Sequence, residues 1–231
     1  MCDEIKFNQS KNMKFTDYFK SDSQEFLSPQ IKDSQLKAGD FPLELQAQPK
    51  QVIRFLIENA GLSFNRSLYR LFTPADITKW NKNVCKLFPD FEHEIICFGF
   101  DWLGRIFALD KSRIENKQMQ VVLLDPSSAE AFEIPCGFSD FHDIELVNYA
   151  EQALAEEFFN EYLQQNNPQP GYNQCISYIM PIFLGGDDCL HNLVCSDMEI
   201  YWEVCSEMLA SAVRQAQRDS DFEDENFDEI D

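Results

Sequence analysis

Positive charge is the scarcest feature of this sequence. Its 231 residues contain 19 Lys and Arg against 40 Asp and Glu, a formal net charge of 19 − 40 = −21. The 96 residues from Gln118 to Val213 include 16 acidic residues and no Lys or Arg. This balance repels nucleic-acid phosphates and anionic lipid headgroups, so composition excludes both as direct partners. A basic protein partner remains open.

Long apolar runs and signal segments are also missing. No run reaches the roughly 18 apolar residues of a transmembrane helix, and the N-terminus, MCDEIKFNQSKNMKF, lacks the basic and apolar regions of a secretory signal. We therefore expect a cytoplasmic protein. The 8 cysteines include no CxxC pair, and several lie within apolar runs, which predicts reduced thiols in the core rather than disulfides.

Catalytic motifs are sparse. Leu184-Gly185-Gly186 lacks the lysine and the glycine spacing of a phosphate-binding loop. The densest group of possible metal ligands is Asp187, Asp188, Cys189, His191 and Cys195, but its Cys-x-His-x3-Cys spacing matches no common zinc pattern. We therefore predict no catalytic residue, no metal and no cofactor, and a protein that is not an enzyme.

Apolar residues are abundant enough for a sizeable core. They make up 44% of the chain, which includes 21 Phe. The predicted fold class is α+β, with an antiparallel β meander flanked by helices and a long C-terminal amphipathic helix. We expect an N-terminal arm over residues 1–50, without confidently predicted elements, and one α+β domain over 51–218. The run DSDFEDENFDEID (219–231) predicts a disordered acidic tail.

The predicted elements follow from capping and turn residues. A first helix over 51–61 ends at Gly61, and Thr73-Pro74 with Asp76 begins a second helix. Four closely spaced apolar runs with turn residues between them require antiparallel pairing. The remaining predictions are a helical stretch over about 140–164, a buried strand in CISYIMPIFLGG (175–186) with a turn of positive φ at Gly185-Gly186, and a strand at 192–195. The four meander runs are HEIICFGFD (93–101), GRIFALD (104–110), QVVLLD (120–125) and AFEIP (131–135).

The final helix has two contrasting faces. Ser196 as N-cap and Glu199 three residues later form a capping-box pattern. The predicted buried face consists of Met198, Tyr201, Trp202, Cys205, Met208, Leu209 and Ala212. Glu199, Glu203 and Glu207 lie opposite, at a spacing where like charges slightly destabilise a helix. The acidic face is either a water-facing stripe or a binding face. As partner-binding candidates we take these three acids together with Asp187 and Asp188.

Five segments carry a likeness to a known family: GLSFNRSLYRLF (61–72), FGFDWLGRIFALD (98–110), AFEIP (131–135), FHDIELV (141–147) and YIMPIFLGGDDCLHNLVCSDMEIYWEV (178–204). They resemble bacterial immunity-type proteins that share a domain with the immunity proteins of type VI secretion DNase effectors. The resemblance covers roughly residues 50–213 and depends mostly on structural residues, including Trp102, Gly104 and Arg105 at a strand turn. It leaves out the first 50 residues and the acidic tail.

The resemblance implies a non-catalytic protein that binds one cognate toxin, often a nuclease, and protects the producing cell. The charge balance agrees with this, because a nuclease needs a basic groove that an acidic inhibitor could cover. Two alternatives stay open. One is an adaptor or sensor module in another bacterial conflict or defence system. The other is a small hydrolase or metal enzyme that uses Asp187, Asp188, Cys189 and His191.

Overall fold

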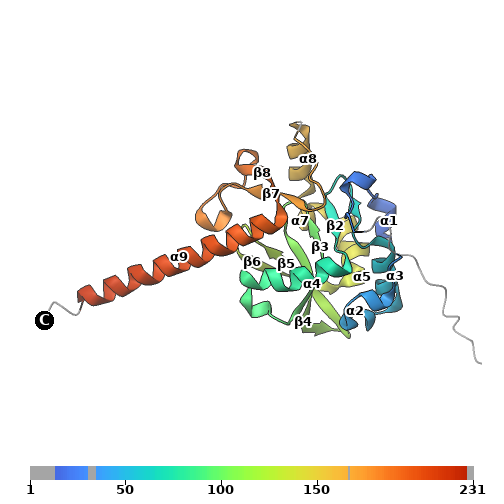
Figure 1. Ribbon diagram of the computed structural model, residues 1–231, viewed down its shortest axis with the longest axis horizontal. Coiled ribbons are helices and arrows are strands. Elements are labelled where there is room, and N and C mark those ends of the chain that lie inside the picture. Colours follow the sequence, from blue (N-terminus) through green and yellow to red (C-terminus); the bar gives the residue numbers. More distant parts are fainter. Residues whose placement is uncertain (1–13, 31–34, 166, 228–231) are drawn as a thin grey trace, which may run out of the picture.

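The computed structural model describes residues 14–30, 35–165 and 167–227, and it describes side chains as far as residue 218. Its main sheet has six strands that pair antiparallel in chain order, so the predicted meander and the α+β class are confirmed (Figure 1). β7 and β8 form a second, two-stranded sheet. The strands are β1 (Ser63–Phe64), β2 (Tyr69–Leu71), β3 (Ile95–Asp101), β4 (Ile106–Glu115), β5 (Gln118–Asp125), β6 (Glu130–Gly137), β7 (Gln174–Tyr178) and β8 (Leu193–Asp197).

Helices cover both faces of the main sheet, and α9 extends well beyond the rest of the molecule (Figure 1). Within the described part of the chain, every helix is too short or too polar to cross a lipid bilayer. The helices are α1 (Phe15–Tyr18), α2 (Leu43–Gln46), α3 (Lys50–Asn59), α4 (Pro74–Asn83), α5 (Phe138–Asp140), α6 (Leu146–Asn148), α7 (Ala150–Leu154), α8 (Glu156–Gln164) and α9 (Met198–Phe227), with a π-helical turn at Phe141–Glu145.

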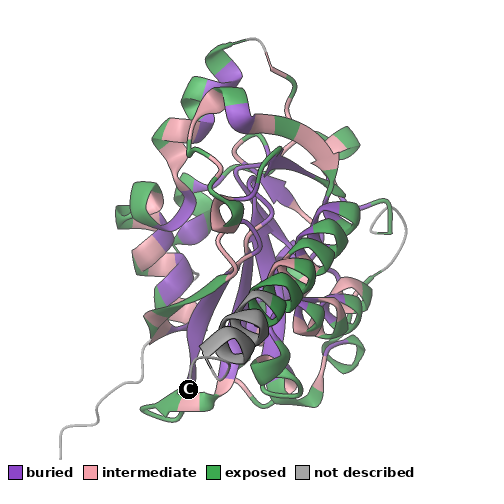
Figure 2. Ribbon diagram, turned by 90° about the vertical axis from the view of Figure 1, so that its left-hand side faces the viewer, coloured by how far each residue is buried: buried purple, intermediate pink, exposed green. Residues whose placement is uncertain are grey.

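The central strand β3 is buried at all seven positions, and the strands of the sheet are largely buried in Figure 2. Its pairing with β4 shifts between Cys97 and Gly99, which marks a bulge. Because a bulge interrupts the alternation of side chains, Phe98 contacts Phe138 on one face, whereas Phe100, two residues later, stacks on Phe72 on the other. One strand thus supplies aromatic side chains to two parts of one continuous cluster, a first core on the Phe98 side and a second core on the Phe100 side.

His142 lies in the first of these cores, among aromatic rings. Its Nδ1 donates to the carbonyl oxygen of Phe138 at 2.9 Å, so Nε2 accepts from the Tyr69 hydroxyl at 3.0 Å. Burial lowers the pKa of the imidazole to about 3, and the ring is neutral in the folded protein at neutral pH. Both ring nitrogens are satisfied, so His142 serves the structure of this core.

Arg70 is the main polar group of the second core. Its guanidinium is fully buried and donates to the carbonyl oxygens of Gly171, Tyr172, Gln174 and Asp101. Its Cζ also lies 4.4 Å from the centre of the Phe100 ring. Burial lowers the pKa of Arg70 to about 10, so the group stays charged at neutral pH. The side chain therefore joins β2, the end of β3 and the segment that leads into β7.

Two tryptophans attach the later elements to the strand turn at residues 102–105. The Trp202 indole of α9 donates to the carbonyl oxygen of Gly104 at 2.8 Å, and the Trp102 indole donates to that of Leu154 at 2.8 Å. Within the turn, Arg105 Nε lies 2.6 Å from a carboxylate oxygen of Asp101. This confirms the structural role expected of Trp102, Arg105 and Trp202.

The predicted start of α4 is confirmed, but the predicted N-cap of α9 is wrong by one residue. Thr73 is the N-cap of α4, and Thr73 and Asp76 exchange the hydrogen bonds of a capping box. In α9 the cap is Asp197, whose Oδ1 accepts from the backbone N–H groups of Glu199 and Ile200. Ser196 instead belongs to β8, and its hydroxyl is hydrogen-bonded to that of Ser177 on β7.

The helical stretch predicted over 140–164 is divided by breaks at Tyr149 and Ala155. Ala155 has φ 51°, a left-handed conformation that ends α7 before α8 begins. Arg105 donates to the carbonyl oxygen of Ala153, and Trp102 donates to that of Leu154. The side chains of Trp102 and Arg105, from the turn between β3 and β4, thus occupy carbonyl oxygens that a continuous helix would use. These tertiary contacts override the helical pattern.

The two ends of the chain also differ from expectation. The segment expected to be an arm supplies Phe15, Phe19, Phe41 and Leu45 to the same core as the strands, so packing does not break at residue 50. At the other end, α9 runs to Phe227, into the segment predicted to be disordered from residue 219. The residues from Ser211 to Phe227 contain neither Pro nor Gly, so nothing local stops the helix. Residues 228–231 of the predicted tail lie outside the described residues.

Replacing Arg70 should test the second core. Arg70→Met removes the donor of four hydrogen bonds to backbone carbonyl oxygens, of which those of Gly171 and Asp101 keep one backbone donor each. We therefore expect the free energy of unfolding to fall by about 3–5 kcal/mol. Urea denaturation would measure it. Arg54→Met is the control, since Arg54 is exposed and paired only with Glu58 four residues away, and it should change stability by less than about 0.5 kcal/mol. Equal losses in the two variants would contradict the role of Arg70.

His142 should make stability depend on pH. Its pKa is about 3 when folded and about 6.5 when unfolded, so below pH 6.5 the unfolded chain binds a proton that the folded chain does not. The contribution of neutral His142 to the free energy of unfolding is fully present above pH 6.5. It decreases as the pH is lowered, by about 2 kcal/mol at pH 5. Urea denaturation at pH 7 and pH 5 should show His142→Gln losing correspondingly less stability than the parent. The same loss in both proteins would contradict the assignment.

Candidate functional site

The chain between β7 and β8, hereafter the 179–192 turn, has a conformation that its glycines and one asparagine impose. Gly185 has φ 86°, as predicted, and a Cβ on Gly186 would collide with the carbonyl oxygen of Met180. The Asn192 amide donates to the carbonyl oxygens of Met180 and Asp187 and accepts from the Met180 N–H, each at 2.9 Å. The turn is therefore cross-linked by one buried side chain.

Three of the four ligand-type residues in this turn come together. Donor atoms of Asp187, Cys189 and His191 all lie within 4.8 Å of one another, with Cys189 Sγ 3.2 Å from His191 Nε2. Asp188 takes a different direction, because its carboxylate accepts from the hydroxyl of Tyr178. Burial and this hydrogen bond raise the pKa of Tyr178. Asp187 and Asp188, to which the sequence analysis assigned the same role, therefore have different surroundings.

The three glutamates predicted as one acidic face also differ. Glu199 forms an ion pair with Lys79 of α4 and accepts a hydrogen bond from Asn83, and the bond from Lys79 lowers the pKa of Glu199. Glu203 lies 3.8 Å from Lys86 in the turn that follows α4. Glu207 makes no ion pair with any described residue. Two of the three acids thus face lysines of their own chain.

An exposed apolar stripe runs along α9 beside these acids. Ile200, Val204 and Met208 are spaced by four residues and are 61%, 39% and 38% exposed. The prediction that Met208 is buried is wrong, whereas Met198, Tyr201, Trp202 and Cys205 are buried as expected. We call Ile200, Val204, Met208 and the adjacent Glu207 the α9 face. Up to residue 218, the part of α9 beyond the core is coloured mostly as exposed in Figure 2.

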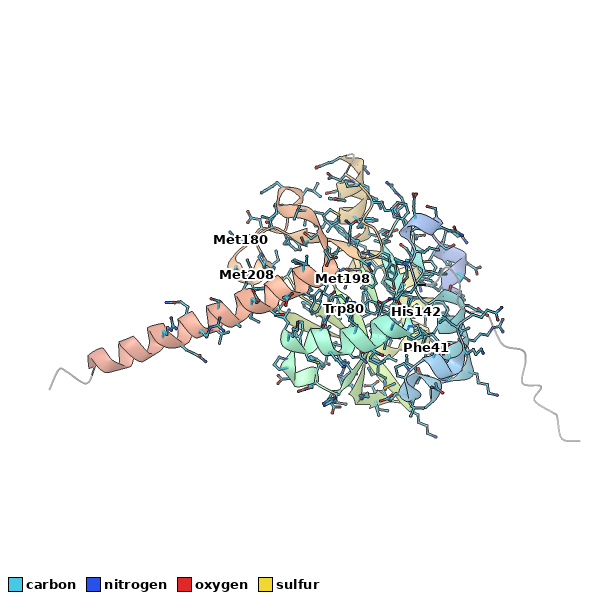
Figure 3. All side chains as sticks on the ribbon, viewed as in Figure 1. Phe41, Trp80, His142, Met180, Met198 and Met208 are labelled. Carbon is cyan, nitrogen blue, oxygen red and sulfur yellow. The ribbon has the colours of Figure 1, made fainter. Side chains whose placement is uncertain are left out.

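The 179–192 turn carries exposed apolar side chains as well. Ile179, Met180 and Leu184 are exposed, and so is Val194 on β8. Figure 3 shows Met180 and Met208 on the same side of the molecule, one in the turn and the other on α9. Apolar side chains with acids around them are the composition of an interface core with a polar rim.

A separate cavity of about 250 Å³ opens between α4 and the start of α9, with Trp80 and Phe72 among its lining residues. Its charged groups are already engaged with the protein. Lys79 pairs with Glu199, and Asp197 caps α9. Asp76 accepts from the hydroxyl of Tyr172. These groups therefore serve the fold, and the cavity is a weaker candidate than the α9 face.

Comparison with known proteins defines the fold further. No protein-family model and no curated protein matches the chain. In fold, the chain is similar to Atu4351 from Agrobacterium tumefaciens. The crystal structure of that protein matches with a TM-score of 0.53 and 17% sequence identity, over 76% of this chain and 83% of that one. At this identity the similarity concerns the fold, so a function has to be argued from the side chains of this chain.

Sequence reasoning found part of this surface and missed the rest. It identified the acids of α9 and the ligand-type residues of the turn from spacing alone. It missed the ion pairs with Lys79 and Lys86, because helical periodicity does not say which element packs alongside. It also missed the apolar stripe, although the spacing of Ile200, Val204 and Met208 was a usable signal.

Removing the Asn192 side chain should loosen the turn. Asn192→Ala removes the partner of the Met180 N–H and of the Met180 carbonyl oxygen, whereas the carbonyl oxygen of Asp187 keeps the Cys189 N–H. We therefore expect the free energy of unfolding to fall by about 1–3 kcal/mol. Amide exchange at Met180 should become faster, and hydrogen exchange together with urea denaturation would measure both effects. Asn160→Ala on the exposed side of α8 is the control and should leave both unchanged. Unchanged exchange at Met180 in Asn192→Ala would contradict this role.

Proposed function

We propose that this chain is a non-catalytic immunity protein that binds and neutralises a cognate toxin, a nuclease with a basic groove. The observation that carries the proposal is the α9 face, where exposed apolar side chains adjoin the unpaired carboxylate of Glu207. The resemblance of residues 50–213 to immunity-type proteins supports the same function.

Charge supports a basic partner. The residues from Gln118 to Val213, which include β5 to β8 and the packed part of α9, contain 16 acids and no Lys or Arg. A surface whose charges are mostly of one sign attracts a partner of opposite charge and accelerates its association. Lys79 and Lys86 neutralise Glu199 and Glu203 in part. We therefore assign the partner contact to Glu207 and the acids of the 179–192 turn ahead of these two.

The apolar stripe supports a stable complex. Charge mainly raises the rate of encounter, whereas dissociation is slowed by apolar side chains at the centre of an interface. Ile200 is the most exposed member of the α9 face, at 61%. A toxin that covers the stripe would bury it together with the adjacent acids, and its basic groove would then face the carboxylates.

Co-expression with the product of the adjacent gene tests this function. We expect a stoichiometric complex on affinity capture and rescue of growth when that product is toxic. The association rate constant should fall about tenfold as salt rises from 50 to 500 mM, because screening removes the electrostatic attraction. A complex with a partner that is not toxic by itself would instead support the adaptor function. Absence of a complex would contradict the proposal.

A matched pair of variants tests the α9 face itself. Ile200→Asp removes an apolar contact without adding positive charge. We expect the Kd of the complex with the toxin to rise at least about tenfold. Ile114→Asp on β4 is the control, because Ile114 is 62% exposed against 61% for Ile200 but belongs to another part of the fold. Surface plasmon resonance would measure both. Equal affinities for the two variants would exclude the α9 face.

A further inference from the structure

Asp187, Cys189 and His191 form a cluster in the 179–192 turn, in which the Cys189 thiol is within hydrogen-bond distance of His191 Nε2 and of the carbonyl oxygen of Asp187. Asp187 and His191 are exposed, and Cys189 is half-buried, so burial does not explain their proximity. Cys189 has extended backbone, with φ −156° and ψ 156°, and a 3-10 turn over Leu190–Asn192 follows it, so the chain turns directly between Cys189 and His191. The three residues thus present a carboxylate oxygen, a thiol sulfur and an imidazole nitrogen to one point.

We propose that these three residues bind a zinc ion. Sulfur, nitrogen and oxygen from Cys, His and Asp are ligands that Zn²⁺ accepts together, whereas Mg²⁺ and Ca²⁺ prefer oxygen alone. Around a tetrahedral zinc ion, a thiolate sulfur and an imidazole nitrogen lie about 3.6 Å apart. Cys189 Sγ and His191 Nε2 are 3.2 Å apart, and all the donor atoms lie within 4.8 Å. Small side-chain rotations are enough to reach binding geometry.

The turn holds the ligands in place before a metal arrives. Asn192 binds the carbonyl oxygen of Asp187, and the backbone N–H of Cys189 donates to that same oxygen. A cross-linked backbone reduces the conformational entropy lost on binding. On binding, the Cys189 thiol releases its proton to solvent, the sulfur coordinates as thiolate, and His191 coordinates through the lone pair of Nε2. Water takes the fourth position, since Asp188 is bound to Tyr178.

This geometry goes beyond the sequence pattern Cys-x-His-x3-Cys, which includes Cys195 and matches no common zinc motif. Cys195 lies on β8, outside the group of three. Asp187 takes the place that the pattern would give to Cys195. The site is therefore visible only once the turn has folded.

Titration of the reduced full-length protein with Co²⁺ and Zn²⁺ tests the proposal. We expect one equivalent of Co²⁺ to give a thiolate charge-transfer band, which Zn²⁺ abolishes by displacement. Zn²⁺ should also raise the Tm, because a ligand that binds the folded state stabilises it. Cys189→Ser should remove the band, and His191→Gln should raise the Kd for Zn²⁺ at least about tenfold.

Cys195→Ser is the matched control and should keep both the band and the affinity. The substituted ligands are exposed or half-buried, so the variants should keep the parent circular-dichroism spectrum and metal-free Tm. No band with the parent protein, or a band that persists in Cys189→Ser, would overturn the proposal. These measurements use the metal ion alone, and their outcome is independent of any toxin.

Discussion

The buried charge of Arg70 joins the six-stranded sheet to the segment that leads into β7. Its guanidinium is neutralised by the dipoles of carbonyl oxygens from the end of β3 and from the segment before β7, rather than by a carboxylate at hydrogen-bond distance. Such a charge can be buried only if all these acceptors keep their positions. The segment they belong to leads directly into β7, whose partner β8 leads into α9. The location of the candidate surface therefore depends on one side chain of β2.

Local signals predicted the elements whose partners are close in sequence. The meander follows from short apolar runs separated by turn residues, and the start of α4 follows from Thr73 and Asp76. The failures came where distant side chains intervene. Trp102 and Arg105 take carbonyl oxygens at the end of α7, and pairing of Ser196 with Ser177 moves the start of α9 by one residue. Neither competition is visible in a local pattern.

The candidate site shows the same division. Periodicity correctly grouped the glutamates of α9, but it could not show that α4 places Lys79 and Lys86 beside two of them. The sequence also shows that possible metal ligands are concentrated around Cys189. It does not show that Asp187 joins Cys189 and His191 whereas Asp188 binds another residue. That difference depends on the hydroxyl of Tyr178, ten residues earlier on β7. In both cases a neighbour from another element decides what an acidic side chain can do.

The way the main sheet ends has a consequence for the protein at high concentration. Unpaired strand edges invite pairing with a second copy and can start aggregation. On the β1 side, Ser21 forms a bridge to Phe64 and covers the edge. On the β6 side, the outermost strand carries Glu130, Glu133 and Pro135, and a proline cannot donate to a new neighbour. A meander that presents one covered edge and one charged, proline-containing edge resists growth into a fibril, so the chain can accumulate without its sheet becoming a template.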